Sequence, residues 1–367
     1  MNFLSKLTLL VPTYNRQEYV LRNMRYWSGR GAAVHVLDGS PAPICTSDLS
    51  GLSNNIHYHH LHMSFSERIR HSMDLIQTDY CALMGDDEFL MPRGLEACIS
   101  EMDANRELVS CMGRCLIFKP TSRGVVSWPG YTEMKDYTLL QNDPVERMIA
   151  HMNPYTCSTI YSVVRTPVWK TAMSILSERN FSVFAIGEYQ FELAVSFLGK
   201  SKVLDSLMWL RSGENPTATP APLWGKHKLK MFYRWWIDKD TFDERKEFLD
   251  IMSDSLALSS PIDRTTIYRG VEKAAEEFSQ YTSSHYKMNY PKRKYYFGVA
   301  LAHLIKYVPR RVRNGLKELS WQYKPRPLIT SIESLEKLSL AGITFDKSEL
   351  SEIEEVLINF HNHQLRK

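Results

Sequence analysis

Short apolar runs alternate with amphipathic stretches along the first 90 residues of the chain. Apolar runs bounded by turn residues predict buried strands, and apolar residues spaced three or four apart predict helices. The alternation predicts strands over residues 7–11, 32–37, 56–61 and 80–84, and helices over residues 17–27 and 64–76. Ser64, with Glu67 three residues later, has the pattern of a capping box and supports a helix start at that point.

This order of strands and helices predicts an α/β fold whose sheet contains parallel strands joined by crossover helices. In such sheets, ligands bind outside the carboxyl ends of the strands. Polar residues stand at three of these ends: Thr13, Tyr14, Asn15 and Arg16 after the first strand, Asp38 after the second, and Asp86, Asp87 and Glu88 after the fourth. We expect these side chains to converge on one crevice.

The middle of the chain continues the mixed pattern and then changes. The stretches LVSCMGRCLIF and YTCSTIYSVV predict strands at residues 108–118 and 155–164. The stretch 184–211 predicts a turn carrying Glu188, a helix to about Leu198, a stop at Gly199 and a last strand into Arg211. Residues 213–225, rich in proline and threonine, predict a boundary between a domain at 1–215 and a mainly helical region at 225–367.

Composition limits the class of protein without naming a function. The 367 residues are 44% hydrophobic and 23% charged, which is typical of a globular chain and argues against overall disorder. The chain has no run of 18 apolar residues, so no membrane-spanning helix is predicted. The six cysteines follow no secretory leader, which predicts a reducing compartment and a cytoplasmic location.

Two clusters contain residue types that can bind metals, but their patterns favour a structural role over a metal site. Cys111 and Cys115 lie in an apolar stretch, and no second pair of Cys or His follows at zinc-site spacing. The segment HYHHLH, with its histidines at 57, 59, 60 and 62, alternates like a half-buried strand and has no acidic or Cys partner beside it. We therefore predict a metal role for neither cluster.

Positive charge is concentrated near the C-terminus. Residues 287–326 hold eleven Lys or Arg and one acid, Glu318, although the whole chain carries only +4. The basic groups flank the apolar stretch 295–308, as in a helix that lies in a membrane interface; a core helix with solvated basic ends fits the pattern equally well. No aromatic and basic motif accompanies the charge, so nucleic acid is not the predicted partner.

The acidic cluster in ALMGDDEFLM, residues 82–91, indicates the chemistry. Carboxylates at the mouth of a sheet hold hard cations such as Mg²⁺ or Mn²⁺, which keep coordination positions free for substrate phosphates. A nucleotide diphosphate leaving group needs such an ion to neutralise its developing charge. Sugar transfer from a nucleotide sugar and nucleotidyl transfer by a polymerase both fit this arrangement.

Several motifs together resemble the family 2 glycosyltransferases of the GT-A fold. The resemblance covers residues 5–215 and rests on LTLLVPTYNR, VLDGS, an arginine-bearing helix, TDYCALMGDDEF and GEYQFEL, in this order. It implies a Rossmann-like mixed sheet flanked by helices, a nucleotide sugar donor with UDP favoured, and bound Mg²⁺ or Mn²⁺. It leaves the C-terminal 150 or so residues unaccounted for.

The resemblance also implies roles for single residues. The nucleotide or its sugar would contact Pro12, Thr13, Tyr14, Arg16, Asp38, Arg68, Asp86 and Arg211, with Asp38 on the base and Arg68 facing the diphosphate. Asp87 would be the metal carboxylate, assisted by Asp86 or Glu88. Glu188 would be the catalytic base, with Glu192, one helical turn further on, as the second candidate.

Two positions depart from the pattern of that family. Gly85 stands where the first acid of the DXD motif is expected, and Tyr189 stands where the aspartate of a Glu-Asp pair is common. The leading hypothesis is an inverting, metal-dependent glycosyltransferase that acts on a glycan or lipid-linked acceptor in bacterial surface polysaccharide synthesis, at the inner face of a membrane. The alternatives are a non-catalytic nucleotide-binding module and a nucleotidyl transferase, although only 85 residues precede the GDD aspartates, too few for a polymerase fingers region.

Overall fold

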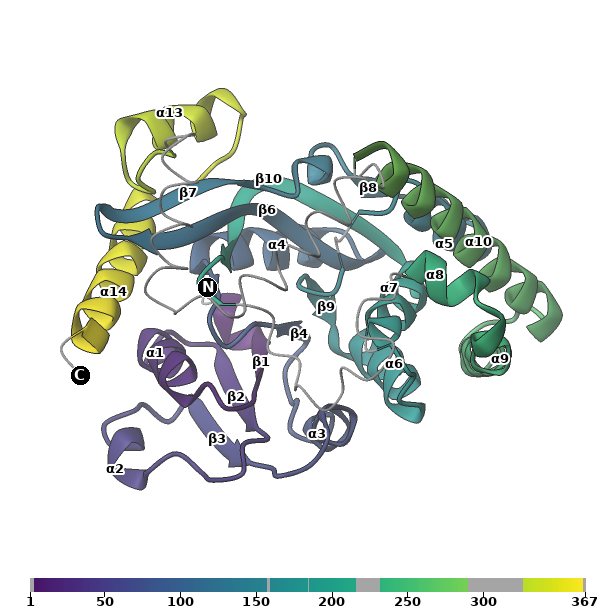
Figure 1. Cartoon of the computed structure of the whole chain (residues 1–367), viewed down its shortest axis with the longest axis horizontal. Coiled ribbons are helices and arrows are strands. Elements are labelled where there is room, and N and C mark those ends of the chain that lie inside the picture. The colour runs from purple at the N-terminus through teal and green to yellow at the C-terminus, as the bar shows by residue number, and fades with distance from the viewer. Residues whose placement is uncertain (1–2, 157–158, 184, 216–231, 290–325, 366–367) are drawn as a thin grey trace, which may run out of the picture.

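The computed structural model describes residues 3–156, 159–183, 185–215, 232–289 and 326–365 (Figure 1). The predicted α/β class is confirmed: one mixed sheet is flanked by helices, and the described part of the C-terminal region is mainly helical. Its strands are β1 Leu7–Thr13, β2 Ala33–Asp38, β3 Ile56–His60, β4 Tyr80–Leu83, β5 Phe89–Leu90, β6 Leu108–Thr121, β7 Gly124–Gly130, β8 Thr138–Leu139, β9 Val163–Arg165 and β10 Lys200–Ser212.

The sheet runs in the order β3-β2-β1-β4-β9-β6-β10-β5, with β7 beside β6 and β8 beside β10. The pairs β3–β2, β2–β1 and β1–β4 are parallel, as the alternation of strands and helices predicts. In this register Thr13 lies opposite Asp38, and Leu10 lies opposite Leu83. The carboxyl ends of β1, β2 and β4 therefore meet at one edge of the sheet.

Helices cover both faces of the sheet because its strands are apolar on both sides. Along β1, Leu7, Leu9 and Val11 belong to one core cluster and Leu10 belongs to the other. The first cluster packs beneath α1 Gln17–Trp27 and α4 Pro92–Ala104. The second packs beneath the helices α3 Phe65–Ser72, α5 Pro144–Met152, α6 Thr166–Glu178 and α7 Ile186–Leu198.

Most of the expected elements form where the pattern places them. The capping box at Ser64 and Glu67 is present, although α3 ends at Ser72 rather than at residue 76. Helix α7 ends at Leu198 and is capped by Gly199, where a Cβ atom would come within 2.2 Å of the Val109 side chain, so close packing against β6 requires glycine.

The strand predicted at residues 155–164 is wrong for most of its length. Only its end forms part of β9, and Ser162 donates a backbone hydrogen bond to Thr159 in a turn. The backbone N–H of Ile160 bonds to Glu192 instead of to a neighbouring strand. A buried carboxylate on α7 thus takes a donor that a sheet ladder would have needed.

The described C-terminal elements pack on both core clusters of the sheet domain. The helices α8 Phe232–Ile237, α9 Phe242–Ala257 and α10 Arg264–Asn289 extend the second cluster, and α13 Ile332–Leu340 and α14 Lys347–Leu365 extend the first. Figure 1 shows α14 beside the β7 end of the sheet and α10 at the opposite end of the molecule. Isolated bridges join Val126 to Leu328 and Ser206 to Thr344.

The basic segment predicted to approach a membrane lies, over residues 290–325, outside the described residues. Within the described ranges, no helix is long and apolar enough to cross a membrane. The division at residues 215–225 stays a prediction.

Candidate functional site

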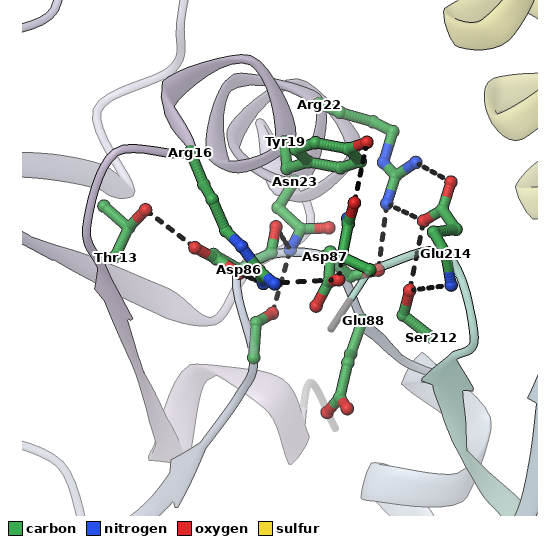
Figure 2. A network of polar contacts seen from close by, with 12 residues as sticks. Thr13, Arg16, Tyr19, Arg22, Asn23, Asp86, Asp87, Glu88, Ser212 and Glu214 are labelled. Atoms are coloured by element: carbon green, nitrogen blue, oxygen red, sulfur yellow. Dashed lines mark hydrogen bonds and ion pairs between the residues drawn. The ribbon is translucent and has the colours of Figure 1, made fainter. Parts of the chain in front are cut away.

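The acidic turn, residues 85–88, follows β4 and faces the loop that follows β1. Thr13 donates a hydrogen bond from Oγ1 to Asp86 Oδ2 at 2.8 Å. One guanidinium nitrogen of Arg16, Nη1, lies 3.0 Å from Asp86 Oδ1 and 3.3 Å from Asp87 Oδ2 (Figure 2). The structure therefore brings the end of β1 and the acidic turn together, as the strand ends predict.

The two aspartates share one cationic partner, the Arg16 guanidinium. Both carboxylates are largely buried, and burial together with the charge of Asp87 raises the pKa of Asp86 to about 6, although Arg16 and Thr13 oppose the rise. Two carboxylates that meet at a single guanidinium nitrogen also suit a hard divalent ion, which binds through one or two carboxylates plus substrate phosphates. Within the described ranges, however, no group of three or more His, Cys, Asp or Glu side chains is arranged to hold a metal ion.

Glu88 does not join the two aspartates. Its side chain points away from the Arg16 cluster in Figure 2, and its Oε2 accepts a hydrogen bond from Trp209 Nε1 at 2.9 Å. Burial and the charge of Asp87 raise the pKa of Glu88 to about 8. A Cβ atom at Gly85 would lie 2.9 Å from the Glu88 carboxyl group, so Glu88 fills the space that a side chain at position 85 would enter.

Asp38, at the end of β2, accepts hydrogen bonds from three residues, on β3, on α1 and in the loop after β2. They come from Tyr58 OH at 2.7 Å, from Gln17 Nε2 at 3.0 Å and from the backbone N–H of Ser40 at 2.8 Å. Burial raises the pKa of Asp38, but these hydrogen bonds together lower it below its ordinary value. Asp38 is therefore an ionised acceptor at the same edge of the sheet as the acidic turn.

Arg68, on α3, brings a buried positive charge to this edge. Its Nη1 donates to the backbone oxygens of Thr13 at 2.7 Å and Leu37 at 2.5 Å. Burial lowers the pKa of Arg68, and the charges of Asp38 and Asp86 act against this. Gly39 permits the approach, because a Cβ atom there would lie 2.7 Å from the guanidinium carbon.

The remaining residues of the first loop surround this edge. Pro12 is the last residue but one of β1, and Tyr14 lies within electrostatic reach of Arg68. Asn15 has a φ of 54°, a left-handed conformation that asparagine tolerates, and its backbone N–H donates to Ser40 Oγ at 2.9 Å. This bond ties the loop after β1 to the loop after β2.

The two glutamates of α7 have different surroundings. Glu188 is partly exposed, and burial together with the charge of Glu192 raises its pKa to about 7, whereas Arg211 and a hydrogen bond from Tyr155 lower it. The charge of Arg211 also lowers the pKa of Glu88, so this arginine lies within electrostatic reach of both α7 and the acidic turn.

Glu192, by contrast, is 0% exposed and its oxygens are occupied. Its Oε2 lies 2.8 Å from His151 Nε2 and accepts a hydrogen bond from Thr159, and its Oε1 accepts the N–H of Ile160 at 3.0 Å. This carboxylate joins α5, α7 and the segment before β9. An acceptor hydroxyl has no open oxygen to approach at Glu192.

Sequence reasoning missed a second layer of polar residues behind the acidic turn. It consists of Arg22 and Asn23 on α1, Glu214 and Asn215 after β10, and His361 on α14. The rule that polar residues after strand ends converge would have found Glu214 and Asn215, which follow the last strand after Gly213. Their place at the start of a proline-rich stretch indicated a boundary instead.

The histidines of β2 and β3 stack on one another. His35 and His57 have ring centroids 4.5 Å apart, and His35 Nδ1 lies 3.0 Å from His59 Nε2. Burial, followed by the charges of His57 and His59, lowers the pKa of His35 to about 4. The histidines thus form a packed stack of rings on the sheet.

Comparisons with known proteins give structural likeness only. No protein-family model matches the chain, and no curated protein matches it. The structure of S. aureus TarS 1–349 in complex with UDP-GlcNAc is similar at 14% identity over 98% of this chain and 92% of that one, with a TM-score of 0.49. The same S. aureus fragment in complex with UDP is similar at 13% identity over 78% and 93% of the two chains, with a TM-score of 0.40. These values establish no family, so the function is argued from the site.

Proposed function

We propose that this protein is a glycosyltransferase that moves a sugar from a nucleotide diphosphate sugar, with UDP-sugars favoured, to a hydroxyl group of an acceptor. The observation that carries the proposal is the meeting of Asp86 and Asp87 at one cationic nitrogen, at the sheet edge where β1, β2 and β4 end. Buried Arg68 and ionised Asp38 stand at the same edge. A metal-bound diphosphate requires carboxylates that hold the metal ion and a positive charge, here Arg68, beside the phosphate oxygens.

Different residues would contact different parts of the nucleotide sugar donor. Asp38 would accept the N–H group of a base such as uracil if that group takes the place of Gln17 Nε2, one of its three present donors, and Arg68 suits the diphosphate. Asp87 with Asp86 would hold Mg²⁺ or Mn²⁺, which neutralises the charge of the departing nucleotide. Arg16 already lies against both carboxylates, so it would pair with the diphosphate once the aspartates turn to the ion.

Glu188 is the proposed base. It removes the proton of the acceptor hydroxyl as that oxygen attacks the anomeric carbon, on the face opposite the departing nucleotide, so the sugar carbon inverts. A raised pKa of about 7 suits a base that works near neutral pH, because the group is partly deprotonated and still accepts a proton readily. Glu192 supports this part of the site through its bonds to His151 and Ile160.

The acceptor and the location of the enzyme are proposed from the sequence. A glycan or lipid-linked acceptor of surface polysaccharide synthesis fits the resemblance to family 2 enzymes. The basic window 287–326 would bring the enzyme to anionic lipids on the cytoplasmic face of a membrane. Vesicle co-sedimentation with and without acidic lipid checks this part separately.

A non-catalytic nucleotide-binding module is the second candidate. The observation that favours it is Gly85, because the position of the first metal acid is filled by the carboxyl group of Glu88, which bonds to Trp209. Such a protein would bind nucleotide and transfer no sugar. Product formation separates the two candidates.

The test is a donor survey by thermal shift, followed by a transfer assay. Purified protein receives a panel of nucleotide sugars with Mn²⁺ or Mg²⁺, with and without EDTA. We expect a rise in Tm with one class of UDP-sugar that EDTA abolishes, and nucleotide release in the presence of acceptor. Absence of any shift with every nucleotide, together with a shift on acidic vesicles or RNA, would contradict the proposal and assign the function to the basic window.

A further inference from the structure

The C-terminal helix α14 lies behind the acidic turn, although some 260 residues of sequence separate them. Phe360 and His361 on this helix reach the second layer of polar residues described above. The ring of Phe360 lies 5.1 Å from that of Tyr19 and 4.7 Å from the guanidinium carbon of Arg22. Helix α14 therefore packs against the second layer of polar residues, on the side away from the proposed donor.

Arg22 is the centre of this layer. It is 4% exposed, and its Nη2 donates to the backbone oxygen of Asp87 at 2.9 Å. Both terminal nitrogens also bind the carboxylate of Glu214, at 3.1 Å and 2.9 Å, in the bidentate geometry that fixes orientation (Figure 2). The Asp87 carbonyl is thus held by a guanidinium that cannot rotate without breaking a buried ion pair.

Glu214 is held in turn from two sides. His361 Nε2 lies within hydrogen-bond distance of Glu214 Oε1, and Ser212 Oγ donates to Glu214 Oε2 at 3.2 Å. Burial raises the pKa of Glu214, but His361 and Arg22 together lower it, so the carboxylate is ionised. The chain of contacts therefore runs from α14 through Glu214 and Arg22 to Asp87.

The rest of the acidic turn is held in the same way. Asn23 Nδ2 donates to the backbone oxygens of Gly85 at 3.1 Å and Asp86 at 2.8 Å. Asn215 Nδ2 donates to Asp87 Oδ2 at 3.1 Å, and Asn215 Oδ1 accepts a hydrogen bond from Tyr19. Every carbonyl group from residue 85 to residue 87 has a donor from the second layer.

We propose that Glu214 and His361 are positioning residues, through which docking of α14 sets the geometry of the Asp87 carboxylate and hence the affinity of the site for a divalent cation and nucleotide diphosphate. The cation and nucleotide part rests on the proposed function; the mechanical part does not. Neither residue touches the donor site, and each acts through Arg22. On this account the C-terminal helix supports the donor site without contacting the donor.

Hydrogen exchange followed by mass spectrometry, on the full chain without ligand, tests the mechanical part. His361→Leu removes the donor to Glu214, whereas His361→Gln keeps an N–H at similar reach. Glu352→Gln is the matched control, because the Glu352–Arg30 ion pair also joins α14 to the turn after α1 without touching the acidic turn. We expect faster exchange in peptides covering residues 85–91 for His361→Leu, near wild-type exchange for His361→Gln, and no change for Glu352→Gln.

Binding of Mn²⁺ in the presence of UDP, measured by electron paramagnetic resonance, tests the consequence. We expect His361→Leu to weaken Mn²⁺ binding about 10-fold, the lower range for loss of an outer-shell partner, with recovery in His361→Gln. Glu214→Gln should act in the same direction, and His361→Leu decides the test if Glu214→Gln does not fold.

Two results overturn the inference: unchanged exchange at residues 85–91 in His361→Leu, or equal effects of His361→Leu and Glu352→Gln, which would show only that α14 must dock. If wild type binds no Mn²⁺ and no UDP while exchange at residues 85–91 still responds to His361→Leu and not to Glu352→Gln, the positioning role stands and the proposed function fails.

Discussion

The acidic turn and helix α7 each carry neighbouring carboxylates, and in each place the protein uses them differently. On the turn, Glu88 is buried against Trp209 while Asp86 and Asp87 face the Arg16 guanidinium. On α7, Glu192 is saturated by donors while Glu188 stays partly exposed. Sequence proximity therefore does not assign a role to a carboxylate; the number of donors already bound to it does.

Asp87→Ala should give the largest effect, because it removes one of two carboxylates at the cation site. We expect loss of nucleotide-sugar turnover by about 10³-fold, the upper range for loss of one electrostatic stabiliser, together with loss of the EDTA-sensitive rise in Tm. Asp48→Ala, an exposed acid on α2 Thr46–Leu49, is the control and should be unaffected. Full activity in Asp87→Ala would end the proposal of a metal-dependent transferase.

Glu188→Gln should reduce kcat by at least about 10²-fold, the lower range for loss of a general base. Affinity for UDP should remain, because Glu188 acts on the acceptor and not on the donor. Steady-state kinetics with titration of UDP separates the two quantities. A kcat close to that of wild type would transfer the base role to another residue.

Glu192→Gln should affect stability rather than chemistry. The amide replaces an acceptor oxygen by a donor next to Thr159 and His151, and a buried mismatch of this kind costs about 1–3 kcal/mol of unfolding free energy. We expect lower resistance to urea, with kcat per folded molecule retained. Glu355→Gln, an exposed carboxylate on α14, is the control for loss of charge alone. A large fall in kcat without loss of stability would reverse the assignment of the two glutamates.

The smallest expected effect is a change in the shape of the pH profile of kcat rather than a loss of activity. Because Glu188 must be deprotonated to act and its pKa is raised to about 7, kcat at saturating donor and Mn²⁺ should rise with pH through about 7.

His35 has a pKa lowered to about 4, so the folded protein binds this proton less readily than the unfolded chain does. Its contribution to stability is present above pH 6.5 and is lost as the pH falls toward about 4.

Activity near pH 7 should therefore change before the Tm does. Parallel profiles of kcat and Tm check this. If kcat instead falls only at the lower pH where the Tm also falls, the loss of activity would be due to unfolding and not to protonation of Glu188.

Local pattern was enough to predict the elements that build the site. The spacing of apolar residues predicts the strands around Leu9, Val36 and Ala82 and the helix over residues 17–27, because a buried strand or an amphipathic helix needs that spacing. Parallel pairing then brings Thr13, Asp38 and the acidic turn to one edge, which follows from the order of strands and helices.

Tertiary structure decided the contacts between distant segments, which local pattern cannot predict. The exclusion of Glu88 from the aspartate pair depends on Trp209 in β10, and the saturation of Glu192 depends on His151 in α5. The layer behind Asp87 joins α1, the end of β10 and α14, three segments whose spacing in sequence contains no sign of their contact. The sequence by itself determined which residues could act at the site. Packing between distant segments decided which of their carboxylates are already saturated by hydrogen-bond donors.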